Sequence, residues 1–141
     1  MNKKNENLKK WKSRKWNVIL VPEKKYNPYE NVSDSKLRPV MVWNNSRSLK
    51  GWNICFYCST KPPIKAHKGF CFEAKIKNQE KNTWIYMNKI IWVHYKDIGI
   101  KIGTVTDSKI KESIVMFISE FFSNDIKIKM EAKKASKYKN K

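Results

Sequence analysis

Short runs of alternating apolar and polar residues fill the first two thirds of the chain, and this alternation is typical of β-strands. It predicts five or six strands, at residues 16–21, 39–43, 52–58, 70–77, 83–87 and 89–94. The last two runs form either two short strands or one bent strand. Polar segments rich in Pro, Asn and Ser separate the runs, at residues 22–37, 44–51, 60–69 and 78–82. We therefore expect a small antiparallel sheet with long connections.

The period of the pattern changes after Thr106, where apolar residues recur at the three- and four-residue spacing of a helix. Thr106 or Asp107 supplies a helix N-cap. The sequence thus predicts one amphipathic helix over residues 108–122, whose apolar stripe serves core or dimer packing. The expected fold class is mainly β with α, a curled sheet or barrel with a C-terminal helix.

The composition is that of one small globular domain. The chain has 141 residues, of which 40% are hydrophobic, with six Trp. A disordered basic tail would be poor in aromatics, and four Gly and three Cys exclude collagen-like and disulfide-scaffold classes. No segment approaches the roughly 20 apolar residues of a membrane span. The expected protein is soluble and cytoplasmic, with no membrane segment.

The charge is concentrated at the two ends of the chain. Lys and Arg number 31 against 12 Asp and Glu, a net charge of +19. The pattern predicts a basic arm at 1–15, a domain at 16–123 and a Lys-rich tail at 124–141. Such a field suits nucleic acid, an anionic surface or an acidic protein, although Lys-rich ends also serve solubility alone. Only three residues are Arg, so each is a functional candidate.

The cysteines do not follow the pattern of a metal site. Cys55 and Cys58 form a C-x-x-C, but the residues between them are bulky and the segment alternates like a strand. The chain has three further residues that could bind a metal, but their spacing is irregular: Cys71, His67 and His94. We expect buried, reduced thiols, no metal and no cofactor.

The order of several short motifs resembles the MazF/PemK toxins of type II toxin–antitoxin systems. The matching pieces are Val18–Val21, Ser33–Val42 with its Arg38-Pro39, Ile54–Thr60, Phe72-Glu73 and Ile102–Val105, whose Gly-Thr pair forms a turn. The resemblance implies a small SH3-like antiparallel barrel of the MazF/CcdB type with a C-terminal helix. It also implies a homodimer, single-stranded RNA bound across the dimer interface, and a cognate antitoxin protein.

Three positions depart from the family's usual residues. Trp16-Asn17 stands where the family has Gly-Asp before the first strand. Val32-Ser33-Asp34 replaces Gly-Ser-Glu in the first loop, and Ser59 replaces a Thr.

The chemistry that the resemblance implies is metal-independent RNA cleavage. The ribose 2′-OH attacks the neighbouring phosphate and leaves a 2′,3′-cyclic phosphate and a free 5′-OH. The protein then has only to move two protons and to stabilise the extra charge on phosphorus. By resemblance Arg38 is the catalytic Arg and Ser59 the catalytic hydroxyl, with Thr60 as its alternative. Arg38 could instead form a strand-edge salt bridge with Asp34.

The expected substrate contacts lie in the loops around these residues. Asp34 would orient Arg38, while Lys36, Arg47, Lys61 and His67 would hold RNA, with nearby aromatics stacking on bases. Two other functions stay open on the same fold: a non-catalytic nucleic-acid-binding protein and a CcdB-like toxin directed at gyrase. His94 is expected to be structural.

Overall fold

The computed structural model describes residues 14–27, 36–45 and 50–121. The expected basic arm, the Lys-rich tail, Asp34 and Arg47 lie outside these residues. The chain divides into two compact units, at residues 1–107 and 108–141. The first unit holds a mainly β structure, and the described part of the second is helical over residues 108–121.

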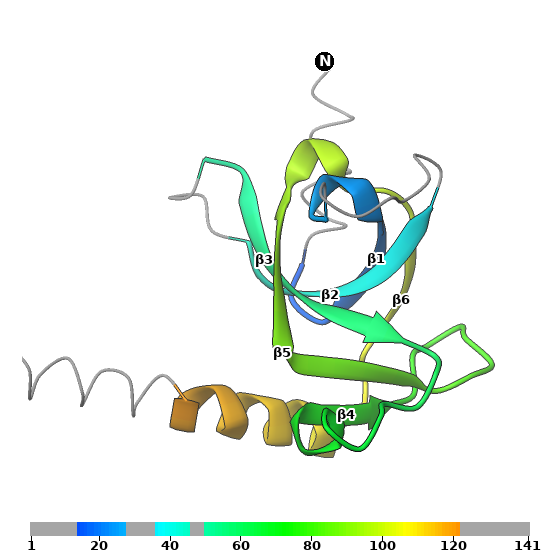
Figure 1. The fold of residues 1–141 in the computed structure, drawn as a ribbon, viewed down its shortest axis with the longest axis vertical. Helices are drawn as coiled ribbons and strands as arrows, with labels where there is room; N and C mark the ends of the chain where they lie inside the picture. Colours follow the sequence, from blue (N-terminus) through cyan, green and yellow to red (C-terminus); the bar gives the residue numbers. More distant parts are fainter. Residues whose placement is uncertain (1–13, 28–35, 46–49, 122–141) are drawn as a thin grey trace, which may run out of the picture. The chain divides into compact units, whose positions relative to one another are not determined.

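Six strands form one antiparallel sheet in the order β4-β5-β3-β2-β1-β6 (Figure 1). The strands are β1 (Asn17–Pro22), β2 (Leu37–Asn45), β3 (Trp52–Ser59), β4 (Cys71–Ala74), β5 (Thr83–His94) and β6 (Lys101–Thr104). Within the described residues, the connections contain the single-turn 3₁₀ helices η1 (Glu23–Lys25), η3 (Lys68–Phe70) and η4 (Tyr95–Asp97).

The expectation of five or six strands followed by a helix is confirmed, with three changes. Residues 83–94 form the single bent strand β5. The strand expected at 70–77 is shorter and ends at Ala74. Gly103 and Thr104, expected in a turn, lie in strand β6. Strand β6 forms because it supplies hydrogen-bonding partners to the second edge of β1, where Val18 pairs with Gly103.

Both faces of the sheet carry buried residues, with Val18, Met41, Phe56 and Cys58 on one face and a second cluster on the other, which we call the inner face. Alternate side chains of a strand share a face, and those of four neighbouring strands converge here. The buried cluster consists of Ile19 and Val21, Val40 and Val42, Cys55, Ile91 and Val93, together with Ile98. Tyr26, Tyr57 and Tyr95 pack against it and are only partly buried. The three tyrosines therefore connect the core with the polar end of the inner face.

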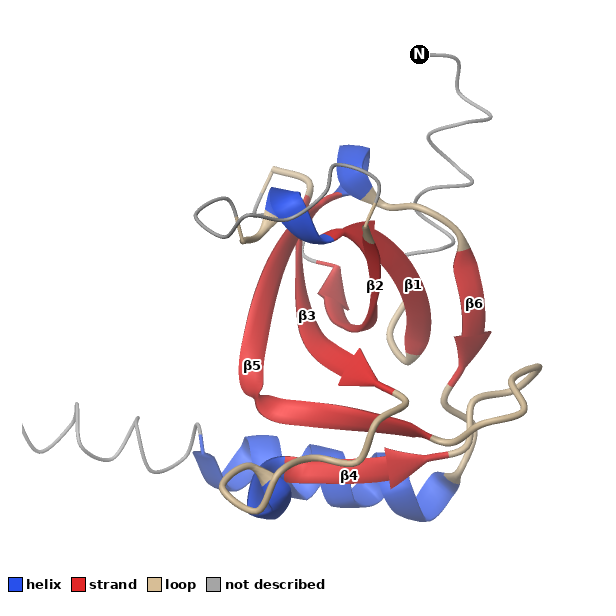
Figure 2. Ribbon diagram, turned by 45° about the vertical axis from the view of Figure 1, so that its right-hand side comes forward, coloured by secondary structure: helices blue, strands red, loops and turns tan. Residues whose placement is uncertain are grey.

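The sheet curls strongly but does not close (Figure 2). Its outermost strands, β4 and β6, form no ladder with each other. One isolated bridge, between Ile76 and Val105, joins the segments that follow these two strands. The Lys77 N–H also donates to the Thr104 carbonyl at 3.1 Å.

The predicted apolar stripe of the helix is buried only in part. Ile114 and Ile118, one turn apart, are buried, whereas Val115, Met116 and Phe121 are exposed. Within residues 14–27, 36–45 and 50–121, no helix has the length and hydropathy needed to cross a bilayer.

Trp16 has a backbone conformation that side chains rarely adopt. Its φ is 77°, in the left-handed region that glycine enters at little cost. Its N–H donates to the Val42 carbonyl, and its own carbonyl accepts from Val105, both at 2.9 Å. The indole packs edge-on against Trp43 at 5.5 Å between centroids. These contacts hold a bulky residue where the resembling family has glycine.

Gly103 gives the first testable prediction. A Cβ at this position would collide with the Ile76 side chain and the Lys77 carbonyl oxygen. We therefore expect Gly103→Ala to lower the free energy of unfolding by about 1–3 kcal/mol. Urea denaturation measures the change. Gly69→Ala is the matched control, because a Cβ there meets nothing within 4 Å, and equal destabilisation by both changes would contradict the close approach.

Candidate functional site

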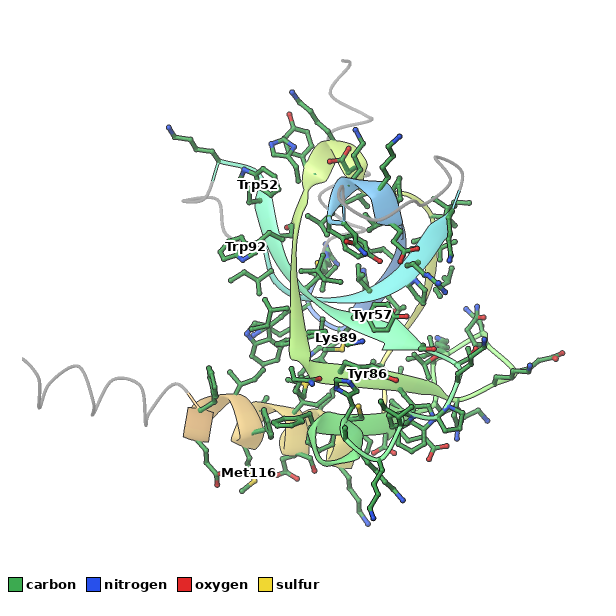
Figure 3. The ribbon with its side chains drawn as sticks, viewed as in Figure 1. Trp52, Tyr57, Tyr86, Lys89, Trp92 and Met116 are labelled. Carbon is green, nitrogen blue, oxygen red and sulfur yellow. The ribbon has the colours of Figure 1, made fainter. Side chains whose placement is uncertain are left out.

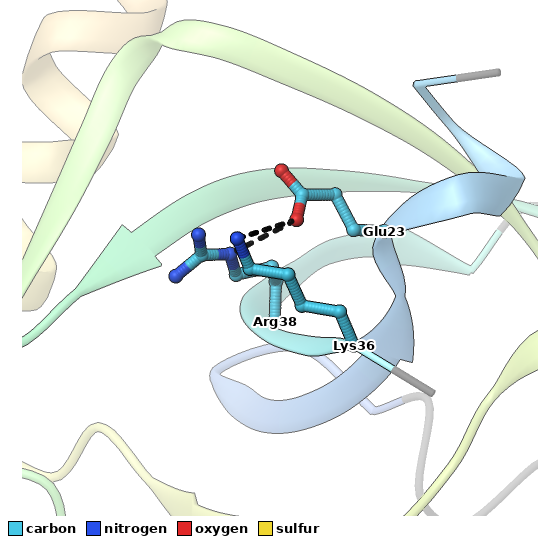
Figure 4. A network of polar contacts seen from close by, with 3 residues as sticks. All are labelled: Glu23, Lys36 and Arg38. Carbon is cyan, nitrogen blue, oxygen red and sulfur yellow. Dashed lines mark hydrogen bonds and ion pairs between the residues drawn. The ribbon is translucent and has the colours of Figure 1, made fainter. Parts of the chain in front are cut away.

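Glu23, Lys36 and Arg38 form a charged cluster where β1 and β2 meet their connecting loop (Figure 4). The Arg38 Nε donates to Glu23 Oε2 at 3.2 Å, and Lys36 Nζ lies 3.6 Å from the same oxygen. The pairing of Val21 with Arg38 places these residues together. Two cations face one carboxylate, so the cluster retains one unit of positive charge.

The guanidinium of Arg38 is bonded through one of its three nitrogens, Nε. The two terminal nitrogens, which form the fork of the side chain, are open. The bond to Glu23 uses Nε, and Figure 4 shows both terminal nitrogens turned away from the carboxylate. Neither has a hydrogen-bond partner among the described residues. The side chain is 35% exposed. Arg38 can therefore present two parallel N–H donors to an oxyanion such as phosphate.

Two tyrosines border this cluster on the inner face. The Tyr26 hydroxyl is buried and has no hydrogen-bond partner in the described part of the chain. Burial, followed by the nearby Glu23 and Tyr57, raises the pKa of Tyr26 well above its ordinary value, while Arg38 opposes the rise. Tyr26 thus stays a neutral phenol beside the charged groups, with a hydroxyl that can donate.

A second group of aromatic and basic side chains adjoins the first at Tyr57 (Figure 3). The rings of Tyr57 and Tyr86 meet edge-on at 5.2 Å between centroids. Lys89 Nζ lies 5.0 Å from the centroid of Tyr57 and 4.9 Å from that of Tyr86. Each distance is within the range of a cation–π contact. Desolvation, with smaller effects from Cys71 and Tyr57, raises the pKa of Tyr86.

The bend in β5 creates this group. The register jumps from Phe56↔Ile90 to Tyr57↔Tyr86, so three extra residues, 87–89, lie on β5. Such a bulge bends a strand and changes the direction of its side chains. It places Lys89 over the two rings.

His67, which the sequence suggests as a substrate contact, lies in the second group. Its Nδ1 lies 2.8 Å from Asn88 Nδ2, and its ring centroid is 6.1 Å from that of Tyr86. With the amide nitrogen donating, neutral His67 carries its proton on Nε2. Lys36, Arg38, Tyr57, Tyr86, Lys89 and His67 make up what we call the basic–aromatic strip.

Ser59 lies near Arg38 along the sheet but does not contact it. The β2–β3 ladder ends at Val40↔Tyr57, so each residue is two positions past the last pair, where the strands diverge in Figure 1. The Ser59 Oγ accepts the Lys61 N–H at 3.2 Å. No hydrogen bond joins it to Arg38.

The other predicted residues are distributed differently. Thr60 lines a shallow hollow with Glu73, Lys81 and Trp84, among others, away from Arg38's carboxylate partner. Lys61 is exposed beside Ser59. Asp34, expected to pair with Arg38, and Arg47 lie outside the described residues, and Glu23 is the carboxylate that Arg38 contacts.

His94 is structural, as expected. Its ring lies 5.1 Å from that of Trp52 and 4.6 Å from that of Tyr95, and its Nδ1 accepts the Lys96 N–H at 3.3 Å.

The cysteines behave as packed thiols. Cys55 and Cys58 are buried in β3, and residues three apart in a strand point to opposite faces, so the two sulfurs cannot bind one ion together. Burial raises the pKa of Cys55 to about 12 and that of Cys58 also upward. Cys71 is partly exposed, and its thiol donates to the His67 carbonyl at 3.2 Å.

With this geometry established, we compared the chain with known proteins. No family model and no curated protein sequence matches it.

Sequence reasoning missed Glu23 and Lys89. Glu23 could have been found from the hairpin register, because Val21 opposite Arg38 implies Glu23 opposite Lys36. The Glu23 N–H indeed donates to the Lys36 carbonyl at 2.9 Å. Lys89 gave no such signal, since a bulge inside an alternating run cannot be located from the pattern alone.

The cysteines give the second prediction. In the native protein an aromatic disulfide reagent at pH 8 should modify only Cys71, because the other two thiols are buried and protonated. Three thiols should react after unfolding in guanidinium. The absorbance of the released thiolate counts the thiols, and Cys71→Ser should abolish the native reaction. Native modification of Cys55 or Cys58 would contradict the burial.

Proposed function

We propose that this chain is a metal-independent endoribonuclease, a toxin of the MazF/PemK kind that cleaves single-stranded RNA to leave a 2′,3′-cyclic phosphate. The observation that carries the proposal is the open fork of Arg38, held on a strand by Glu23 through Nε alone. A preorganised pair of donors suits a phosphorane-like transition state, because it meets the developing charge without reorganising.

The reaction divides among few groups. The substrate's own 2′-OH is the nucleophile and loses its proton to water as its oxygen bonds to phosphorus. The bond from phosphorus to the 5′ oxygen breaks as that oxygen takes a proton from water, which leaves the cyclic phosphate and a free 5′-OH. Arg38 binds the nonbridging oxygens, and Glu23 is a positioning residue that fixes the guanidinium plane. The Ser59 hydroxyl, after exchanging its bond with the Lys61 N–H, orients the phosphate. A metal is not needed for charge neutralisation when an Arg fork supplies it.

The basic–aromatic strip would hold the RNA on either side of the cut. Lys36 and Lys89 contribute charge, while Tyr57 offers a partly exposed ring. Alternating cations and rings bind single strands by pairing with phosphates and stacking with bases. We assign no group of this strip to the edges of the bases. The strip is therefore proposed to contribute affinity for RNA and not a preference for its sequence.

Fold and assembly belong to the same proposal. The Ile76–Val105 bridge supports a sheet that is a variant of the SH3-like barrel, and we propose a homodimer regulated by a cognate antitoxin protein. The +19 charge suits both RNA and an acidic inhibitor.

A non-catalytic RNA-binding protein is the second candidate. It is favoured by one observation: the Ser59 hydroxyl already has a backbone partner and lies beyond the β2–β3 ladder from Arg38. In that case the strip binds RNA and no bond is broken.

Arg38→Lys is the decisive change. It keeps the charge but loses the fork, so RNA cleavage in EDTA should fall by about 100-fold or more, the scale of one lost transition-state donor. Gel analysis of products with 2′,3′-cyclic phosphate ends measures the rate.

Arg14→Lys is the matched control, because Arg14 is exposed and lies outside the site, and it should leave the rate unchanged. Cleavage by Arg38→Lys at the parental rate would refute the enzyme. RNA binding without cleavage by the parent protein would establish the second candidate instead.

Ser59 separates a hydroxyl role from a structural one. Ser59→Ala should slow cleavage, whereas Ser59→Thr should retain it, because threonine keeps the hydroxyl. The Arg38→Lys, Ser59→Ala double variant should lose less than the product of the two single losses, since both residues act on one phosphate. Single-turnover rates test this, and full multiplication would show that the residues act independently.

A further inference from the structure

Strand β5 changes its neighbours at the bend. Along residues 83–86 it pairs with β3 on one side and β4 on the other. Along Ile90–His94 it pairs with β3 alone, and no described strand lies on its other edge. Figure 2 shows this half of β5 at the rim of the sheet. The chain therefore presents an open strand edge within its described part.

The hydrogen-bonding groups of this edge can be assigned from the ladder. The Tyr95 N–H donates to the Gly51 carbonyl at 2.9 Å, which makes Gly51 and Tyr95 a hydrogen-bonded pair. Antiparallel ladders alternate between hydrogen-bonded and non-hydrogen-bonded pairs. Ile90 and Trp92 therefore direct their backbone N–H and C=O groups away from β3.

The same residues are apolar and exposed. Ile90 is 48% exposed and Trp92 is 50% exposed, and Trp52 beside them on β3 is 43% exposed. By the register all three lie on the face opposite the inner one, which we call the outer face and on which Phe56 is buried. Figure 3 labels Trp52 and Trp92 on this side. Sheet edges of natural proteins usually carry inward charges, proline or a covering element, which prevent pairing with another chain. Residues 90–94 contain neither proline nor a Lys, Arg, Asp or Glu.

We propose that the Ile90–His94 edge binds an extended segment of an acidic protein, which adds a strand to the sheet. Alternate N–H and C=O groups can be matched by another polypeptide backbone, and alternate apolar side chains of that segment would cover Ile90 and Trp92. A nucleic acid offers no such ladder.

Charge selects an acidic partner over a second copy of the chain. Lys96 follows the edge in the chain, and the chain as a whole is strongly basic. A second copy would bring the same basic residue to this edge, and like charges oppose pairing there. Acidic residues alternating with apolar ones would complement the positive charge and the exposed side chains.

The proposal does not depend on the ribonuclease activity. Arg38 and Tyr57 belong to the inner face, whereas Ile90 and Trp92 project from the outer one. Peptide binding and RNA cleavage can therefore be measured separately, and failure of either leaves the other intact.

The test uses the full chain and a synthetic probe. The probe is a capped nine-residue peptide in which Val alternates with Glu, and isothermal titration calorimetry measures its binding at low salt. We expect saturable binding at one site. Two further probes are N-methylated at every second residue, one at the odd positions and one at the even positions, so that each lacks the N–H donors of one peptide edge. The probe that lacks the donors facing β5 should bind at least tenfold more weakly than the unmethylated probe. A probe with Lys in place of Glu should not bind.

Two variants locate the site. Trp92→Pro removes an outward N–H without breaking the β3 ladder, and Ile90→Lys places a charge on the edge. Each should weaken binding at least tenfold. Ile100→Lys is the matched control, because Ile100 is 64% exposed and its carbonyl accepts the Leu20 N–H of β1. This control variant should bind the peptide as tightly as the parent chain does. Thermal melts verify that each variant folds. If Trp92→Pro does not fold, the Ile90→Lys variant and the methylated probes together still test the proposal.

Several results would overturn the proposal. They are no binding by the parent chain, equal binding of all the N-methylated probes, or unchanged affinity in the Ile90 variant. If sedimentation shows a dimer that Ile90→Lys dissociates, the occupant of the edge is a second copy and the proposal is overturned. Loss of poly(U) binding in Ile90→Lys, with peptide binding retained, would assign the edge to RNA.

Discussion

The antiparallel pairing of β1 with β2 is the constraint on which the other features depend. Its register, with Ile19 opposite Val40 and Val21 opposite Arg38, turns the aliphatic residues of both strands toward the core. A shift of one residue would move each side chain of the shifted strand to the other face, and Arg38 would no longer lie opposite Val21. The same register brings Glu23 to the cations of β2. Core packing thus fixes the position of Arg38, although its guanidinium lies outside the core.

The bend of β5 is the second organising feature, and it acts on both faces. The three extra residues at 87–89 interrupt the ladder with β3 and place Lys89 over Tyr57 and Tyr86. Beyond the bend, β5 no longer pairs with β4, and residues 90–94 form an open edge within the described part of the chain. One irregularity therefore produces a cationic group on the inner face and an unpaired edge beside the outer face.

The two faces differ in the chemistry that they present. The inner face ends in Arg38, Lys36 and neutral phenols, which suit a charged and partly aromatic ligand such as single-stranded RNA. The outer face of β3 and β5 shows indole and aliphatic side chains and suits a polypeptide. A basic chain with both surfaces could bind RNA at one and an acidic regulatory protein at the other. The sheet between them would connect the two sites through shared strands.

The sequence by itself determined the mainly β class, the positions of the first five strands along the chain and the terminal helix. These follow from local periodicity, which burial on one face of a strand or helix imposes on neighbouring residues. It also placed Arg38 at the start of a strand, because an Arg-Pro pair after a polar loop marks such a start. Only the tertiary structure decided that Glu23 holds Arg38, that Ser59 lies apart from it, and that β6 pairs with β1. Those outcomes depend on strand register and on a bulge, which arise from contacts between residues far apart in the chain.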